Sequence, residues 1–236
     1  HGNLKKYRLR PTDAAILDAN GNLAVDRATG FFKDTAQSYW STVIDGRNVI
    51  LGGAANELPA PTPRKIYTYL GSSSDLTDGT NSVESGNSLL TDARLDISGI
   101  AGEPTRADVI RYIRGDDLKD WNNNNVFTDQ RNQLGDPLHS QPVSAIYGPG
   151  QRDGLLFLAT NDGVVHALDL ETGVEQWAFI PPEFLADQVG LFENATTADK
   201  HYGVDGDLRV LMIGDRDNVV ETGERVFLYF GMGRGG

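Results

Sequence analysis

Four residues near the C-terminal end of the sequence have the types and spacing of a calcium loop. Asp215, Asp217 and Glu221 offer carboxylates, and Val219 offers a backbone carbonyl between the last two. A hard cation binds several oxygen atoms, and carboxylates at alternate positions of a tight loop converge on one point. The spacing therefore predicts that Asp215, Asp217, Val219 and Glu221 bind Ca²⁺.

Two departures from the usual pattern leave a second interpretation of this loop open. Ile213, at the first position, has no side-chain oxygen, and Asn218 stands where glycine usually makes the bend. Asparagine tolerates the left-handed conformation of such a bend. An acidic hairpin that joins two strands without any metal explains the same residues.

The same spacing of oxygen-bearing residues recurs in residues 18–26 and in residues 120–129. In the first segment, a hairpin turn at Asn20-Gly21 explains the residues without a metal. In the second, a solvated polar loop explains them equally well. Short oxygen-rich patterns recur by chance, so both segments are weaker candidates than the loop around Asp217.

The triplet Arg114-Gly115-Asp116 matches the integrin-recognition sequence, but a local structural role is favoured. Residues 105–113 predict a helix, because Thr105 can cap it and its apolar residues share one face. Arg114 then lies where a cation favours the helix dipole, and Gly115 supplies the C-terminal stop. We predict that the triplet ends a helix.

Residue types argue against an enzyme. The sequence contains no cysteine, which excludes thiol catalysis, disulfides and cysteine-zinc sites. His139, His166 and His201 lie far apart and follow no metal spacing. Asp136, His139 and Ser140 are crowded on one loop without a nucleophile elbow. We expect Asp136 and Ser140 to hydrogen-bond the backbone, and the protein to be non-enzymatic.

Charge and apolar content exclude further classes of function. The chain has 236 residues and a formal net charge of −12, which argues against nucleic acid and anionic membranes as partners. It contains no apolar run long enough to span a membrane and no signal peptide. The sequence starts at His1 and stops in a glycine-rich run, so we expect a piece of a longer protein.

The candidate site residues need a framework of regular structure to position them. Residues 153–182 predict part of it, as three β-strands joined by two tight turns. The strands cover residues 155–160, 164–169 and 174–180. The first is a continuous apolar run, typical of a strand buried on both faces. Asp162-Gly163 predicts a hairpin turn, and Gly173 fits the left-handed position of the second turn. Three strands in this order make up most of a β-propeller blade.

The predicted fold is an all-β propeller fragment with a few short helices and long loops. Residues 133–236 hold about two blades, the second with strands at residues 208–213 and 225–232 and truncated at the C-terminus. Residues 1–132 form the N-terminal part of the propeller region, with an irregular insertion from about residue 71 and one short helix. Weaker patterns predict strands at residues 4–9, 49–51 and 66–70 and a helix at residues 31–40.

Short motifs spread over nearly the whole chain carry a family resemblance. The most specific is Leu-Gly-Asp-Pro-Leu-His-Ser-Gln-Pro-Val at residues 134–143. The others are residues 2–9, residues 38–41 with 45–46 and 52–55, residues 113–116, residues 202–206 and residues 229–236. In this order they resemble the C-terminal propeller of the PilY family, the type IV pilus biogenesis factors and tip-associated adhesins.

The resemblance implies a non-enzymatic factor, secreted to the pilus tip or the bacterial outer surface, that supports pilus extension, twitching motility and adhesion. Its implied partners are minor pilins in the pilus tip complex and a host or surface receptor. Its implied calcium loop follows residues 202–206 and matches residues 213–221 only in part. Two alternatives stay open. One is a quinone-dependent dehydrogenase, whose usual vicinal cysteine pair this sequence lacks, and the other is a generic cell-surface propeller scaffold.

Overall fold

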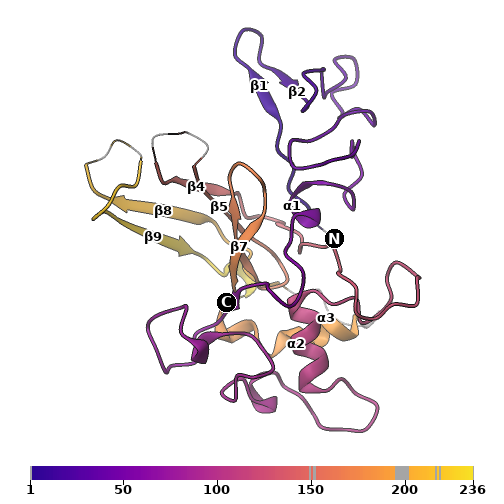
Figure 1. Cartoon of the computed structure of the whole chain (residues 1–236), viewed down its shortest axis with the longest axis vertical. Coiled ribbons are helices and arrows are strands. Elements are labelled where there is room, and N and C mark those ends of the chain that lie inside the picture. Colours follow the sequence, from indigo (N-terminus) through magenta and orange to yellow (C-terminus); the bar gives the residue numbers. More distant parts are fainter. Residues whose placement is uncertain are drawn as a thin grey trace.

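A five-stranded sheet lies at the centre of the molecule (Figure 1). The computed structural model describes residues 2–148, 150, 153–194, 202–215, 217 and 219–235. The strand order is β3-β7-β6-β5-β4, and every neighbouring pair is antiparallel except β3 with β7. The strands are β3 (Ile66–Tyr67), β4 (Val143–Ile146), β5 (Gly154–Ala159), β6 (Val165–Asp169) and β7 (Glu175–Phe179).

The three consecutive strands β5, β6 and β7 confirm the predicted meander. Both turns place a glycine in the left-handed region, at φ 85° for Gly163 and φ 78° for Gly173. Side chains alternate across the strands, so Phe157 and Ala167 enter one hydrophobic core while Leu158 and Leu168 enter a second core. The apolar run of the first strand is therefore buried on both faces, as predicted.

Helices pack beside one end of this sheet. α2 (Arg106–Arg114) begins at a capping box between Thr105 and Asp108 and ends at Gly115, which has φ 107°. α3 (Asp187–Glu193) contacts it through Tyr112 and Phe192, whose rings meet edge to face at 5.3 Å. The shorter helices are α1 (Gly53–Asn56), η1 (Gly79–Asn81), η2 (Asp92–Arg94), η3 (Pro182–Phe184) and η4 (Gly233–Gly235).

The Arg114-Gly115-Asp116 triplet is fixed by its own neighbourhood. The Arg114 guanidinium donates hydrogen bonds to four backbone carbonyls, those of Pro61, Thr62, Arg64 and Val83. The Asp116 carboxylate accepts a hydrogen bond from Arg111 at 3.0 Å. Both charged groups of the triplet thus have intramolecular partners, and the predicted helix end is confirmed.

Residues 2–58 form an irregular segment beside the sheet (Figure 1). Its regular strands are only β1 (Arg8–Arg10) and β2 (Ala15–Leu17). Trp40 and Lys6 connect it to the β6–β7 turn, because Trp40 Nε1 donates to the Glu171 carbonyl at 3.0 Å and Lys6 Nζ donates to the Leu170 carbonyl at 2.6 Å. The helix predicted at residues 31–40 and the strand predicted at 49–51 are absent from this described segment.

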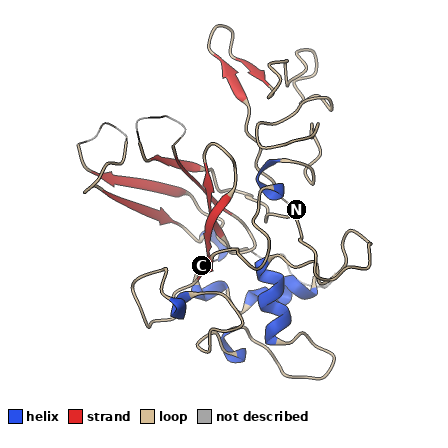
Figure 2. Ribbon diagram, viewed as in Figure 1, coloured by secondary structure: helices blue, strands red, loops and turns tan. Residues whose placement is uncertain are grey.

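The prediction of an all-β propeller fragment was wrong. The structure is mixed α/β with small sheets, 14% helix and 22% strand, and its described part shows no propeller (Figure 2). In place of a second blade, β8 (Leu208–Ile213) and β9 (Arg225–Phe230) form a two-stranded antiparallel ribbon. The prediction failed because one blade-like meander was extended to residues that form loops and helices. No helix in the described ranges has the length and apolar character to cross a membrane.

Replacing Gly173 by alanine tests the packing of the irregular segment on the sheet. A Cβ at Gly173 would lie 2.6 Å from the Trp40 ring, whereas one at Gly21, with nearly the same φ of 80°, would meet nothing within 4 Å. Both substitutions incur the left-handed penalty of about 1–2 kcal/mol. We expect Gly173→Ala to lower the free energy of unfolding by a further ~1–3 kcal/mol, measured by urea denaturation. Equal losses for the two variants would contradict this contact.

A polar cavity and an acidic hairpin as candidate functional sites

The hairpin between β8 and β9 carries the predicted calcium ligands, and the structure describes all four of them. The Asp217 amide donates to the Asp215 carboxylate at 3.1 Å, and the Val219 amide donates to the Asp217 carboxylate at 2.8 Å. Val219 also forms a parallel bridge with Ile146 of β4. The carboxylates therefore stabilise the turn by accepting backbone hydrogen bonds. Asn218, predicted to make the bend, lies outside the described residues.

Glu224, which the sequence analysis missed, closes this hairpin. Its two carboxylate oxygens accept the backbone amides of Asp215 and Glu221, each at 2.8 Å. In the described part of the chain, no group of three or more acidic or histidine side chains could hold a metal ion. Calcium binding by Asp215, Asp217, Val219 and Glu221 stays a prediction. The backbone amides that donate hydrogen bonds to these carboxylates would compete with a cation for the same oxygen atoms.

The two weaker oxygen-rich segments are also organised by internal hydrogen bonds. Asp18 is buried, and its Oδ1 accepts the amides of Asn20 and Asn22. In the other segment, Asp129 Oδ2 accepts hydrogen bonds from the side-chain amides of Asn122 and Asn124. Both arrangements match the metal-free interpretations of these segments.

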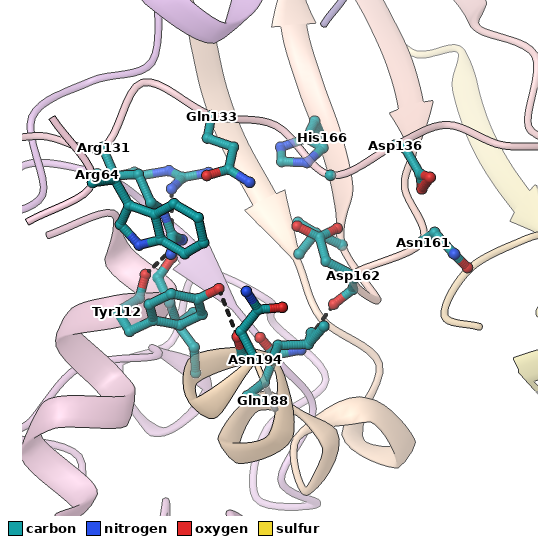
Figure 3. A pocket seen from close by; sticks show the side chains of 15 residues that line it. Arg64, Tyr112, Arg131, Gln133, Asp136, Asn161, Asp162, His166, Gln188 and Asn194 are labelled. Carbon is teal, nitrogen blue, oxygen red and sulfur yellow. Dashed lines mark hydrogen bonds between the residues drawn. The ribbon is translucent and has the colours of Figure 1, made fainter. Parts of the chain in front are cut away.

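A polar cavity of about 290 Å³ lies between α2, α3, the turn from β5 to β6 and the loop that precedes β4 (Figure 3). Two arginines, two aspartates, four side-chain amides and His166 line it, together with Tyr112 and Trp121. The charged and amide residues are Arg64, Arg131, Asp136, Asp162, Gln133, Asn161, Gln188 and Asn194. Its volume is near the lower end of the range for small-molecule sites.

A chain of buried polar groups forms the floor of this cavity. Arg64 donates two hydrogen bonds to Glu175, at 2.5 and 2.9 Å, and Glu175 also pairs with His166 Nδ1 at 2.6 Å. His166 Nε2 lies 3.3 Å from the Thr160 hydroxyl, which in turn donates to Asp162. His166 is thus a buried residue of the core.

Glu175 is ionised because of its partners. Its side chain is fully buried, and burial raises the pKa of its carboxyl group. The Arg64 charge and the hydrogen bonds from His166 and Arg64 outweigh burial, and the pKa of Glu175 falls to about 2. The positive charge of Arg64 is therefore already neutralised within the protein.

Arg131 on the cavity wall is not neutralised in this way. Its guanidinium stacks on the Tyr112 ring at 3.7 Å and donates through Nη2 to the Tyr112 carbonyl. Its Nε and Nη1 atoms are buried and have no hydrogen-bond partner among the described residues. A buried charged donor without an acceptor is costly, so these atoms mark a place where a ligand can bind.

Asp136, His139 and Ser140, which share one loop, differ in their contacts. His139 pairs with Asp205 at 2.8 Å, and the Asp136 backbone carbonyl accepts a hydrogen bond from the Asn161 amide. The prediction that the Ser140 hydroxyl bonds the backbone was wrong, because this buried oxygen has no partner in the described ranges. His201 lies outside the described residues.

Comparison with known proteins adds no relative. No family model, no curated protein and no solved structure matches this chain.

Glu175→Ala tests the buried chain of polar groups. The substitution leaves Arg64 buried without its counter-ion, so we expect the free energy of unfolding to fall by about 3–5 kcal/mol at pH 7, measured by urea denaturation. The exposed residue Glu183 provides the matched control, and Glu183→Ala is expected to change stability by less than about 0.5 kcal/mol.

The pH dependence gives a second measurement on the same residue. The pKa of Glu175 is about 2 in the folded protein, below the value of about 4.3 for an unperturbed glutamate. Its stabilising effect is therefore complete above about pH 4.3 and is lost as the pH falls toward 2. The stability difference between wild type and Glu175→Gln should shrink over that interval. A difference that does not change with pH would contradict the assignment.

Calorimetric titration tests calcium binding by the hairpin. Because Ile213 offers no oxygen and backbone amides compete for the carboxylates, we expect a weak dissociation constant of about 10⁻⁴ to 10⁻³ M in the calcium-stripped protein. Asp217→Ala should abolish the heat of binding, and the matched control Asp34→Ala, at an exposed aspartate, should preserve it. Indistinguishable heats for wild type and Asp217→Ala would exclude this site.

Proposed function

We propose that this chain is part of a non-enzymatic type IV pilus biogenesis factor and tip-associated adhesin. The proposal rests on the resemblance of its motifs to the PilY family. Minor pilins of the pilus tip complex and a host or surface receptor are the proposed partners. Calcium modulation belongs to the proposal only through the hairpin around Asp217.

Contacts between the motifs carry the proposal. Segments that lie far apart in the sequence meet in pairs: Gly2 donates to Leu134, His139 pairs with Asp205, and Gly206 donates to Gly231. Residues 2–9, 134–143, 202–206 and 229–236, which carry the resemblance, are thus connected to one another. Motifs that depend on each other are less easily produced by chance than separate short patterns.

Two glycines show this dependence most clearly. A Cβ on Gly2 would lie 2.1 Å from the Gly135 carbonyl oxygen, and a Cβ on Gly206 would lie 2.5 Å from the Gly231 carbonyl oxygen. Each glycine is required because the backbone of another motif passes close by. This interdependence supports reading the motifs as one family signature.

An exposed apolar face on the β8–β9 ribbon supports a binding role. The large side chains on this face are between 38% and 56% exposed, and they are Leu211, Ile213, Phe227 and Tyr229. Large apolar side chains that gather on one surface are typical of protein interaction sites. A protein partner such as a pilin fits this character better than a nucleic acid, given the net charge of −12.

Deletion of the gene in its own bacterium tests the proposed function. We expect loss of surface pili and of twitching motility, with both restored by the wild-type gene. A complementing gene with Leu211→Ser and Tyr229→Ser should restore less than about a tenth of the piliation if this face binds the pilus, since central aromatic contacts often cost 2 kcal/mol or more. Ile100→Ser, at an exposed apolar residue outside the ribbon, is the control.

Two results would contradict the proposal. One is normal piliation and twitching in the deletion strain. The other is dye reduction by the full-length protein with pyrroloquinoline quinone, because turnover of that kind belongs to a dehydrogenase and not to an adhesin.

A further inference from the structure

The walls of the polar cavity in Figure 3 hold charged groups whose hydrogen-bonding capacity the protein itself does not fill. Arg131 brings a permanent positive charge, and two of its nitrogen atoms are buried without an acceptor in the described part of the chain. Its ring contact with Tyr112 and its bond to the Tyr112 carbonyl hold the guanidinium in place. The donors are therefore fixed before any ligand arrives, which lowers the entropic cost of binding.

Acceptors lie on the other side of the same cavity. Figure 3 shows Asp136 and Asp162 across the cavity from Arg131. Asp162 accepts a hydrogen bond from Thr160, whereas the Asp136 carboxylate receives none from the described residues. Gln188, whose amide nitrogen donates to the Asp162 carbonyl, fixes this wall to α3. A ligand must accept hydrogen bonds on one side and donate them on the other.

The balance of charge decides between classes of ligand. Arg64 is neutralised by Glu175, so Arg131 contributes one positive charge against the negative charges of Asp136 and Asp162. By formal charge, these three groups sum to −1. A phosphate or another multivalent anion would meet this excess at close range.

A neutral ligand with several hydroxyl groups meets all of these requirements. Hydroxyl oxygens accept from arginine, and hydroxyl protons are donated to carboxylates. Trp121 also lines the cavity, and its backbone amide donates a hydrogen bond to the buried Asp117 carboxylate at 3.0 Å. We propose that the cavity binds a single neutral sugar ring, with Arg131 as donor and Asp136 as acceptor. The volume of about 290 Å³ suits a ligand of this size.

This inference goes beyond the pilus role and does not depend on it. Sugar binding is measured on the purified chain, whereas piliation is measured in cells. Failure of one experiment therefore leaves the other proposal standing.

Saturation-transfer NMR on the full chain provides the test, with D-glucose, D-galactose, D-mannose and N-acetyl-D-glucosamine as probes. We expect saturation transfer to at least one of these sugars. Asp136→Asn keeps the shape of the side chain and removes its charge, and it should weaken binding about tenfold or more, as expected for a hydrogen bond to a charged group. Asp34→Asn, at an exposed aspartate in the N-terminal segment, should leave binding unchanged.

Arg131→Gln provides the second variant and should also weaken binding at least about tenfold. Unfolding curves show whether this variant is folded, and Asp136→Asn carries the test alone if it is not. Galacturonate and inorganic phosphate serve as anionic probes. The proposal is overturned if no neutral sugar binds, if only the anions bind, or if Asp136→Asn binds the sugar as tightly as wild type.

Discussion

Backbone carbonyls outside regular structure need hydrogen-bond donors, and this requirement shapes most of the molecule. Long side chains supply the donors. Lys5 Nζ donates to three carbonyls in residues 45–48, and Arg114 donates to four carbonyls from two separate loops. Asn81 and Asn87, both buried, bond two carbonyls each. A buried carbonyl without a hydrogen bond is costly. In the loops, these side chains donate the hydrogen bonds that backbone amides of a neighbouring strand donate in a sheet.

The same requirement links the loops to the central sheet. Arg64 belongs to the loop before β3, Glu175 begins β7 and His166 lies on β6, so one carboxylate connects a loop with two strands. Nearby, the Ala178 amide donates to the Lys65 carbonyl, which places β3 beside β7. The buried ion pair therefore fixes where an irregular segment meets regular structure. The floor of the polar cavity follows from that position.

Local sequence patterns predicted the local structure well. The meander, the hairpin glycines, the capped helix and the strands β8 and β9 all depend on residues within about ten positions of one another, and all were found where expected. The parallel pair β3–β7 joins residues more than a hundred positions apart, and helix α3 depends on packing against α2. Neither feature has a strong local signal in the sequence. The propeller prediction was wrong because it extended one local pattern to the whole chain.

The candidate sites divide in the same way. The acidic hairpin was visible in the sequence because Asp215, Asp217 and Glu221 are close together, although the role of Glu224 at its base was not. The polar cavity was not visible at all, because its walls come from residues 64 to 194. Arg131 reads in the sequence as an ordinary solvated residue of a polar loop. Its significance comes from burial beside Tyr112, and burial is a property of the tertiary structure alone.

That difference explains why the two kinds of site call for different ligands. A hairpin made from one segment places its acceptors next to its own amides, so the loop satisfies much of its own hydrogen-bonding demand. A cavity built from distant segments brings donors and acceptors to opposite walls, as for Arg131 and Asp136 in Figure 3. Groups held apart in this way remain available to a molecule that fits between them. In this irregular fold, the long loops need many side-chain hydrogen bonds to satisfy their own backbone. The same loops also bring together the cavity, whose walls hold donors and acceptors without partners.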